Sequence, residues 1–335
     1  MSDDPFVSHR GLLFTVAYEM LGSAADAEDV LQESWLKWSR VDPATVQHPR
    51  AYLVRVVTHA ALDRMKAQAR RREEYVGPWL PEPLLTSPDV ADNVELADSL
   101  STAMLLVLET LTPTERAVFL LRDVFDVPYD ELAEAVGKTP AAVRQIAHRA
   151  REHVAARRPR SAASRSETRA ALEAFLVALE TGELQPLADV LAPDVVALGD
   201  GGGIKQALPR PVVGADKVGR LMGHGLKVSR ELGMTAQLAE VNGWPALVIR
   251  LAGELDSVLT VRIDDGLVSA IYTVRNPEKL SGARGAGRQP LSRARPRSKY
   301  AATSSGPPTS DSGVAAPNGW LKNGSSRPVF SNGLT

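Results

Sequence analysis

The strongest constraint on the fold of this chain is the segment 129–154, in which two helical patterns meet at Gly137. Thr139 is a good N-cap, and Pro140 suits the first helical position, where the backbone N–H has no partner within the helix. The preceding helix has an apolar side formed by Leu132, Ala133 and Val136. Because glycine permits the tight turn between two helices, the segment predicts a helix-turn-helix in an all-helical domain.

The second helix of this pair has two contrasting sides. Its apolar residues recur at spacings of three and four, so they can pack on the first helix: Val143, Ile146, Ala147, Ala150 and Val154. The polar side holds Arg144, Gln145, His148 and Arg149, and Arg151 follows. Six arginines and one acidic residue lie between positions 140 and 160, which predicts binding to the phosphate backbone of DNA. The alternative is a solvated basic helix of an ordinary bundle.

Composition limits the class of protein. The 335 residues, of which 44% are hydrophobic and 24% charged, suffice for two or three packed domains. The lack of cysteine excludes disulfides, thiol catalysis and thiolate metal sites, and it is typical of a reducing cytoplasm. No signal peptide and no apolar run of about 18 residues is visible, so we expect a cytoplasmic protein that spans no membrane. The sequence predicts neither a metal nor a cofactor.

Three breaks in composition divide the chain. Four prolines in 77–92 forbid a continuous helix, residues 157–166 are rich in Arg, Ser and Ala, and Gly, Pro and Ser dominate from Ser281 onward. The last segment holds eight Lys or Arg against the single Asp311. The expected units are a helical domain at 1–76, a proline-rich linker at 77–93, a second helical domain at 94–158, an α+β domain at 166–280 and a disordered basic tail at 281–335.

The first domain combines an acidic helix with a basic one. Ser23 can cap a helix whose outer face carries Asp26, Glu28, Asp29, Gln32 and Glu33, a surface that suits a basic partner. Its apolar face includes Trp35 and Trp38, which we expect in the core. Pro49 starts a second long helix that ends in a cationic block: Arg64, Lys66, Arg70, Arg71 and Arg72. A merely solvated acidic face is the alternative.

The patterns after the first linker change from helical to mixed. A helix at Ala97 to Leu111 and a capped helix after Thr112 complete the second domain. Beyond Ser166 we expect helices at Glu167 to Glu180 and around Lys217 to Glu231. Strand patterns cover Val195 to Leu198, Ala246 to Leu251, Ser257 to Ile263 and Leu267 to Val274, and Asp264-Asp265-Gly266 predicts a hairpin. This order predicts an α+β domain whose antiparallel sheet curves around a helix and a pocket.

The first two domains resemble the extracytoplasmic-function sigma factors of bacteria. The matching segments are Asp26-Ala-Glu28-Asp29-Val-Leu-Gln32-Glu33-Ser-Trp35, Pro49-Arg-Ala-Tyr52-Leu53, Asp63-Arg64, Leu111-Thr-Pro113-Thr-Glu115-Arg116 and the helix-turn-helix. The resemblance implies that Asp26, Asp29, Gln32 and Glu33 bind core RNA polymerase. It implies that Arg64, Arg70 and Arg71 hold the melted minus-ten element, and that Arg144, Gln145, His148, Arg149 and Arg151 bind the duplex minus-thirty-five element. His59 stands where the family usually has Asn.

Three further motifs resemble the subgroup that carries a SnoaL-like C-terminal domain, a cone-shaped α+β fold related to polyketide cyclases. They are Trp79-Leu80-Pro81, Asp200-Gly201-Gly202-Gly203 with nearby Lys205, and Asn276-Pro277-Glu278-Lys279-Leu280, where Glu278 replaces the more usual Asp. A tryptophan in a linker needs a partner surface to bury it. We therefore expect the three motifs to meet at a regulatory contact between the C-terminal domain and the sigma domains.

These inferences predict a sigma factor that directs promoter-specific transcription initiation and is modulated in cis by its C-terminal domain. Two alternatives stay open. The C-terminal domain could be an enzyme with Asp200, His224 or Asp256 as general acid or base in an apolar pocket. The chain could instead be a helix-turn-helix regulator that senses a ligand, and an unknown small ligand in the C-terminal pocket is compatible with either role. We expect a non-enzymatic protein.

Overall fold

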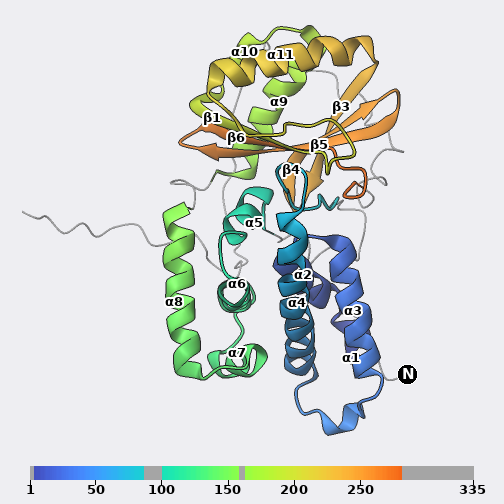
Figure 1. Ribbon diagram of the computed structural model, residues 1–335, viewed down its shortest axis with the longest axis vertical. Helices are drawn as coiled ribbons and strands as arrows, with labels where there is room; N and C mark the ends of the chain where they lie inside the picture. Colours follow the sequence, from blue (N-terminus) through green and yellow to red (C-terminus); the bar gives the residue numbers. More distant parts are fainter. Residues whose placement is uncertain (1–3, 87–99, 158–162, 281–335) are drawn as a thin grey trace, which may run out of the picture. The chain divides into compact units, whose positions relative to one another are not determined.

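The structure is a computed structural model that describes residues 4–86, 100–157 and 163–280 of the chain (Figure 1). The first helical domain comprises α1 (Pro5–Ser8), α2 (Arg10–Leu21), α3 (Ala24–Trp38), the 3₁₀ turn η1 (Pro43–Thr45) and α4 (Pro49–Glu73). The second comprises α5 (Thr102–Leu108), α6 (Pro113–Phe119), the π-helical turn η4 (Leu120–Val124), α7 (Tyr129–Val136) and α8 (Pro140–Arg157). The predicted tail at 281–335 lies outside the described residues.

In the first domain, local signals begin and end the helices. The Ser23 side chain accepts a hydrogen bond from the amide of Asp26 at the start of α3, and α2 ends at Gly22 with a φ of 68°. Trp38 is buried, and its indole N–H donates to Asp4 Oδ1 at 2.9 Å. The expectation for Trp35 was wrong, because this side chain is 45% exposed. It follows the buried Ser34 by one residue and so points about 100° away from it.

The predicted helix-turn-helix is confirmed. Thr112 and Glu115 form a capping box at the start of α6, and α7 ends at Gly137 with a φ of 64°. Thr139 Oγ1 then accepts a hydrogen bond from the amide of Ala142 at 3.3 Å and starts α8. Helix α5 begins at Thr102, later than the expected residue 97, and residues 97–99 lie outside the described ranges.

The two helical domains pack directly on each other. Helix α4 of the first domain lies against α6 and α7 of the second (Figure 1). A single apolar core extends through both domains. At the edge of this contact, Arg55 Nη1 pairs with Glu134 Oε2 at 2.8 Å. The helix-turn-helix is therefore docked against the long basic helix of the first domain.

The C-terminal domain is an α+β unit, as the sequence predicts. Its described elements are α9 (Arg165–Thr181), α10 (Gln185–Ala188), β1 (Leu191–Asp200), β2 (Val212–Val213), α11 (Ala215–Glu231), β3 (Met234–Val241), β4 (Trp244–Leu251), β5 (Glu254–Asp264) and β6 (Leu267–Val274). Within the described residues the sheet has the order β2-β1-β6-β5-β4-β3. Strands β3 to β6 form an antiparallel meander, whereas β1 pairs parallel to β6. The sequence prediction missed β2, β3 and this parallel pairing.

The two faces of the sheet have different covers. Helices α9 and α11 pack on one face (Figure 1). The other face is covered by linker residues and by α5 of the second helical domain, with Leu80 and Leu106 in the same apolar cluster. The linker also extends the sheet, since Leu85 bridges Val241 and the amide of Thr86 donates to the carbonyl of Glu240 at 3.0 Å. No helix in the described part of the chain is long and apolar enough to cross a membrane.

Candidate functional site

The C-terminal domain meets the linker at Asp200, the last residue of β1, whose side chain is 0% exposed. Its Oδ1 accepts hydrogen bonds from the Tyr75 hydroxyl at 2.6 Å and from the amide of Gly202 at 3.1 Å. Its Oδ2 accepts from the amide of Leu80 at 2.9 Å and from Lys279 Nζ at 2.7 Å. One buried carboxylate thus joins the linker to two loops of the C-terminal domain.

Lys279 supplies the positive charge at this contact. Its ammonium group pairs with Asp200 and also donates to the carbonyl of Leu80 at 2.7 Å. The same nitrogen lies 4.1 Å from the ring centre of Trp79 and 4.8 Å from that of Tyr75, at cation–π distance. Tyr75 at the end of the first domain and the linker together therefore surround this lysine with two aromatic rings and a carbonyl oxygen.

Asn276 holds the other side of Tyr75. Its Nδ2 donates to the Tyr75 hydroxyl at 2.9 Å, and its backbone amide donates to the carbonyl of Asp200 at 3.0 Å. A Cβ atom at Gly202 would lie 2.2 Å from this Nδ2, so only glycine fits there. Burial and the hydrogen bond to Asp200 raise the pKa of Tyr75, so its hydroxyl keeps its proton and donates it.

Most residues of the predicted interdomain set reach this contact, but Lys205 does not. The contact contains Trp79, Leu80, Asp200, Gly202, Asn276 and Lys279, and Pro81 and Leu280 are buried nearby. The amide of Glu278, next to Pro277, donates a hydrogen bond to Asn276 Oδ1. Gly201 packs on the carbonyl of Lys205, and Gly203 faces Val76. Lys205 instead pairs with Asp256 at 3.0 Å, inside the C-terminal domain.

Asp256 is the second paired carboxylate of this domain. Besides Lys205, its partner is Arg275, whose Nη2 lies 2.9 Å from Asp256 Oδ1. Burial alone would raise the pKa of Asp256, but the hydrogen bonds from Arg275 and Lys205 outweigh it and hold the pKa below its usual range. Asp256 therefore braces the loop after β1 against β5 and β6 without contacting the linker.

Sequence reasoning missed three residues of the contact: Tyr75, Asn242 and Tyr18. Asn242 lies in the turn between β3 and β4, where its Oδ1 accepts from the amide of Leu84 at 3.0 Å and from the Tyr18 hydroxyl at 3.1 Å. The pair Asn242-Gly243 is a strong signal for a hairpin turn and could have located this turn and β3. For Tyr75 and Tyr18 no local signal indicates a contact so distant in sequence.

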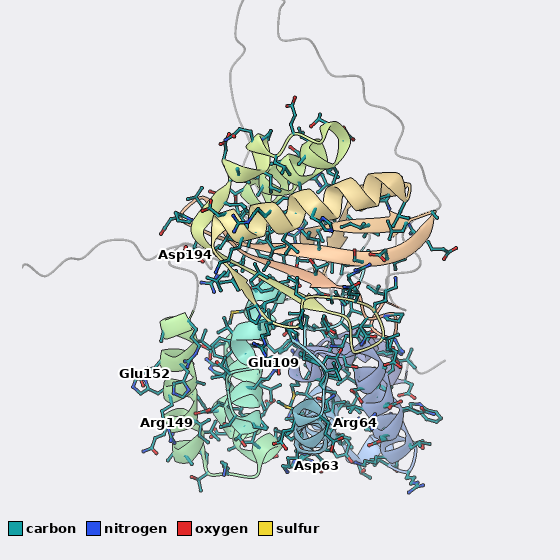
Figure 2. All side chains as sticks on the ribbon, turned by 45° about the horizontal axis from the view of Figure 1, so that its top comes forward. Asp63, Arg64, Glu109, Arg149, Glu152 and Asp194 are labelled. Atoms are coloured by element: carbon teal, nitrogen blue, oxygen red, sulfur yellow. The ribbon has the colours of Figure 1, made fainter. Side chains whose placement is uncertain are left out.

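The predicted polymerase-binding face and the first basic block contact each other. Arg64 on α4 pairs with Asp26 at 2.7 Å and also with Asp29, both on α3. Gln32 and Glu33 are exposed. Figure 2 shows Asp63 and Arg64 together at the same part of α4. Arg70 and Arg71 belong to α4, but their side chains lie outside the described part of the structure.

The predicted DNA-binding residues of α8 divide into two groups. Arg144, Gln145, His148 and Arg149 are exposed, and Figure 2 shows Arg149 and Glu152 on the outer side of the helix. Arg151 is half-buried, and its Nε donates to Asp123 Oδ1 at 2.8 Å, so it ties α8 to η4. The exposed residues are free to approach a groove, whereas Arg151 also has a structural role.

The residues of the enzyme alternative do not line the cleft found in the described part of the chain. Asp200 and Asp256 are held by the partners described above, and His224 is exposed on α11. A cleft of about 880 Å³ lies between α5, the end of α8 and the strands β1, β5 and β6. Its polar lining comes from both domains and includes Arg157, Asp194, Arg262, Asp264 and Tyr272. This cleft is between domains and is not the predicted internal pocket.

Comparisons with known proteins find matches to both helical domains and to the fold of most of the chain. The family models Sigma-70 region 2 and Sigma-70, region 4 match residues 6–71 and 101–154. The ECF RNA polymerase sigma factor SigJ of Mycobacterium tuberculosis is 37% identical over 84% of this chain and 94% of its own length. The probable ECF RNA polymerase sigma factor SigI of that organism is 32% identical over 83% and 94%. The crystal structure of SigJ is similar with a TM-score of 0.67 at 33% identity, covering 83% of this chain and 97% of that one.

Proposed function

This chain belongs to the extracytoplasmic-function sigma factors of RNA polymerase, in the form with a SnoaL-like C-terminal domain, and from that membership we propose that the contact around Asp200 regulates it in cis. As a sigma factor it directs transcription initiation. Through the contact, the C-terminal domain controls how readily the two sigma domains reach polymerase and promoter.

The observation that carries the proposal is the fully buried carboxylate of Asp200. It accepts hydrogen bonds from Tyr75 at the end of the first domain and from Leu80 in the linker, and Lys279 neutralises it. A buried charge is costly to leave unpaired, so the contact weakens strongly when Asp200 loses its cation. Such an arrangement suits a switch between a held and a released linker.

The docked sigma domains explain what the switch would control. In a promoter complex the minus-ten and minus-thirty-five elements lie about 25 base pairs apart, or roughly 85 Å at 3.4 Å per base pair. Helix α4 and the helix-turn-helix are in contact here, joined by Arg55 and Glu134. The two domains must therefore separate before both elements are read, and the linker between them is the segment that the C-terminal domain holds.

We assign the binding surfaces as the residues suggest. Residues 1–76 bind polymerase through the α3 face around Gln32 and Glu33, and the basic end of α4 holds melted DNA. Residues 94–158 read duplex DNA, with Arg144, Gln145 and His148 exposed toward a groove and able to make base contacts. Residues 77–93 are the linker, and 166–280 form the regulatory domain. In this proposal the C-terminal domain acts by contact rather than by catalysis, which is supported by the pairing of Asp200 and Asp256.

Run-off transcription with purified core polymerase tests the proposal. Asp200→Asn keeps the shape of the side chain but removes the charge that holds Lys279, so transcript yield at limiting sigma factor should rise severalfold. Asp256→Asn is the matched control, because it makes the same change in the same domain without touching the linker, and its yield should equal that of the wild type. Equal yields from all three chains would refute regulation through this contact. Tight binding to a duplex operator without polymerase would favour the ligand-sensing regulator instead.

A further inference from the structure

Five residues at the end of α2, Tyr18 to Gly22, contact the linker, the second sigma domain and the C-terminal domain. Tyr18 is fully buried, and its hydroxyl lies 2.6 Å from the carbonyl of Glu82 in the linker and 3.1 Å from Asn242 Oδ1 in the C-terminal domain. Asn242 is itself 1% exposed, and its backbone amide donates to the carbonyl of Leu84 at 2.8 Å. The C-terminal domain thus reaches α2 through one buried amide side chain.

The next residue, Glu19, holds the helix-turn-helix domain. Its backbone carbonyl accepts hydrogen bonds from Arg116 Nε at 3.0 Å and Nη2 at 2.7 Å. Its carboxyl group accepts from the amide of Leu100 at 3.1 Å. Arg116 is 1% exposed, and its remaining nitrogen pairs with Glu109. Two consecutive residues of α2 therefore contact the C-terminal domain and the helix-turn-helix domain, respectively.

Gly22 closes the same turn against the linker. A Cβ atom there would lie 2.7 Å from the Trp79 ring and 3.6 Å from the carboxylate of Glu109, and the positive φ of 68° disfavours other residues. The carbonyl of Gly22 accepts a hydrogen bond from the amide of Glu82 at 2.9 Å. Trp79 of the linker and Glu109 of the second sigma domain consequently lie against one backbone position of the first.

We propose that the last turn of α2, Tyr18 to Gly22, couples the C-terminal domain to the helix-turn-helix domain. While the C-terminal domain contacts this turn, the two sigma domains stay docked. This inference rests on the proposed regulation in cis and names its route. Asn242 and Tyr18 are positioning residues, because they act on the turn and contact neither polymerase nor DNA in this role. When Asn242 releases Tyr18, the turn loses its fixed position and the bonds from Glu19 to Arg116 lose their geometry.

The docked state can be measured by the distance between two spin labels, because the chain has no native cysteine. Ala67 on α4 and Ala141 on α8 are small and exposed, so cysteine at these positions leaves the packing intact. In the full-length wild type, a single distance should dominate. Tyr18→Phe and Asn242→Ala should each raise the separated fraction about fivefold, the shift that corresponds to one lost hydrogen bond.

Thr15→Val is the matched control, since it removes a buried hydroxyl bond from α2 to the carbonyl of Gly11 in the same helix. It should leave the distances unchanged. Leu106→Ala tests a rival route, in which the sheet holds α5 directly. The inference fails if Tyr18→Phe and Asn242→Ala, folded by circular dichroism, keep the wild-type distances, or if Leu106→Ala alone separates the domains. A changed transcript yield for Asp200→Asn with unchanged distances in Tyr18→Phe would reject only this route, whereas an unchanged yield would reject the proposed function.

Discussion

The chain has two junctions that differ in construction. Where the C-terminal domain meets the linker, buried polar side chains around Asp200 make charged hydrogen bonds beside an apolar cluster that includes Leu80. Where the two sigma domains meet, an extended apolar core carries the packing, and the buried polar groups of Glu19 and Arg116 lie at its edge. Charged hydrogen bonds of a fully buried carboxylate are therefore prominent at the first junction, and apolar area is prominent at the second.

This difference indicates which junction responds to a signal. An apolar interface weakens gradually as its area falls, whereas a contact with one buried carboxylate weakens sharply when that carboxylate loses its cation. A small change in the C-terminal domain can therefore release the linker while the apolar core remains intact. The α2 turn connects the two junctions. Variants at either junction should therefore have effects whose relative sizes can be predicted.

The largest effect should come from Arg116. Arg116→Met removes a buried guanidinium whose hydrogen bonds go to Glu19 and Glu109, and the loss of one partner of a buried charged pair costs about 3–5 kcal/mol. Urea denaturation of the full chain should show this fall in the free energy of unfolding of the sigma domains. Arg10→Met is the control, because Arg10 is exposed and pairs with the exposed Glu28, so its cost should stay below about 1 kcal/mol. Similar costs for both would show that the buried guanidinium does not hold the junction between the sigma domains.

A comparison of Lys279 with Lys205, both in the C-terminal domain, gives the next largest effect. Lys279→Met leaves Asp200 without its cation, a loss of about 1.5–3 kcal/mol at the linker. Hydrogen exchange of the Leu80 amide, which donates to Asp200, should accelerate about 10- to 100-fold. Lys205→Met should not change this exchange, because Asp256 keeps Arg275 and does not touch the linker. Acceleration by Lys205→Met would show that the whole domain, rather than the contact, holds the linker.

The junction between the sigma domains should respond to pH. Burial raises the pKa of Glu19 from 4.5 to about 8, against the opposing effects of the Leu100 amide and Arg116. Once the domains separate, the carboxyl group meets water and regains its ordinary pKa. The proton therefore stabilises the docked state fully below about pH 4.5, and this contribution is lost as the pH rises through about 8.

The labelled chain should accordingly show more of the separated distance at pH 9 than at pH 6. Burial also raises the pKa of Glu82, so protonation of Glu82 favours the docked state as well. The other charged groups around Glu19 are Arg116 and its partner Glu109. Glu19→Gln mimics the protonated form and should flatten most of the pH dependence. A pH response that survives this substitution unchanged would assign the titration to another group.

The smallest effect should come from the Tyr75 hydroxyl. Tyr75→Phe removes one neutral donor from Asp200, which keeps the amides of Gly202 and Leu80 and the charge of Lys279. The expected cost is about 1 kcal/mol, seen as a modest rise in Leu80 exchange. Tyr272→Phe, which removes a buried hydroxyl from the sheet, should leave that exchange unchanged. An effect of Tyr75→Phe larger than that of Lys279→Met would reverse the order that charge predicts.

The helix-turn-helix could be predicted from sequence because its determinants are local. A cap at Thr139, a left-handed residue at Gly137 and an apolar periodicity all lie within a few residues of one another. The motifs at 79, 200 and 276 were placed together by resemblance, and the structure brings most of their residues into one contact. Lys205 and Trp35 show the limit of this reasoning, since the partner of one and the exposure of the other depend on tertiary packing.

The remaining features are long-range and have no local signature. The parallel pairing of β1 with β6 joins strands separated by most of the domain, and Tyr18 meets Asn242 across three domains. From sequence alone, a tyrosine in an apolar helix looks like an ordinary core residue, because the partner of its hydroxyl group is not known. Asn242-Gly243 was the exception, because this turn signal would have indicated the hairpin of β3 and β4.

The affinity of core RNA polymerase for the full-length chain tests the central claim most directly. If the docked state masks the binding surfaces, the apparent dissociation constant is the intrinsic one divided by the separated fraction. Asp200→Asn should therefore bind core polymerase several times more tightly than the wild type, and Asp256→Asn should bind equally well. Equal affinities of Asp200→Asn and the wild type, with both chains folded, would contradict regulation through the Asp200 contact.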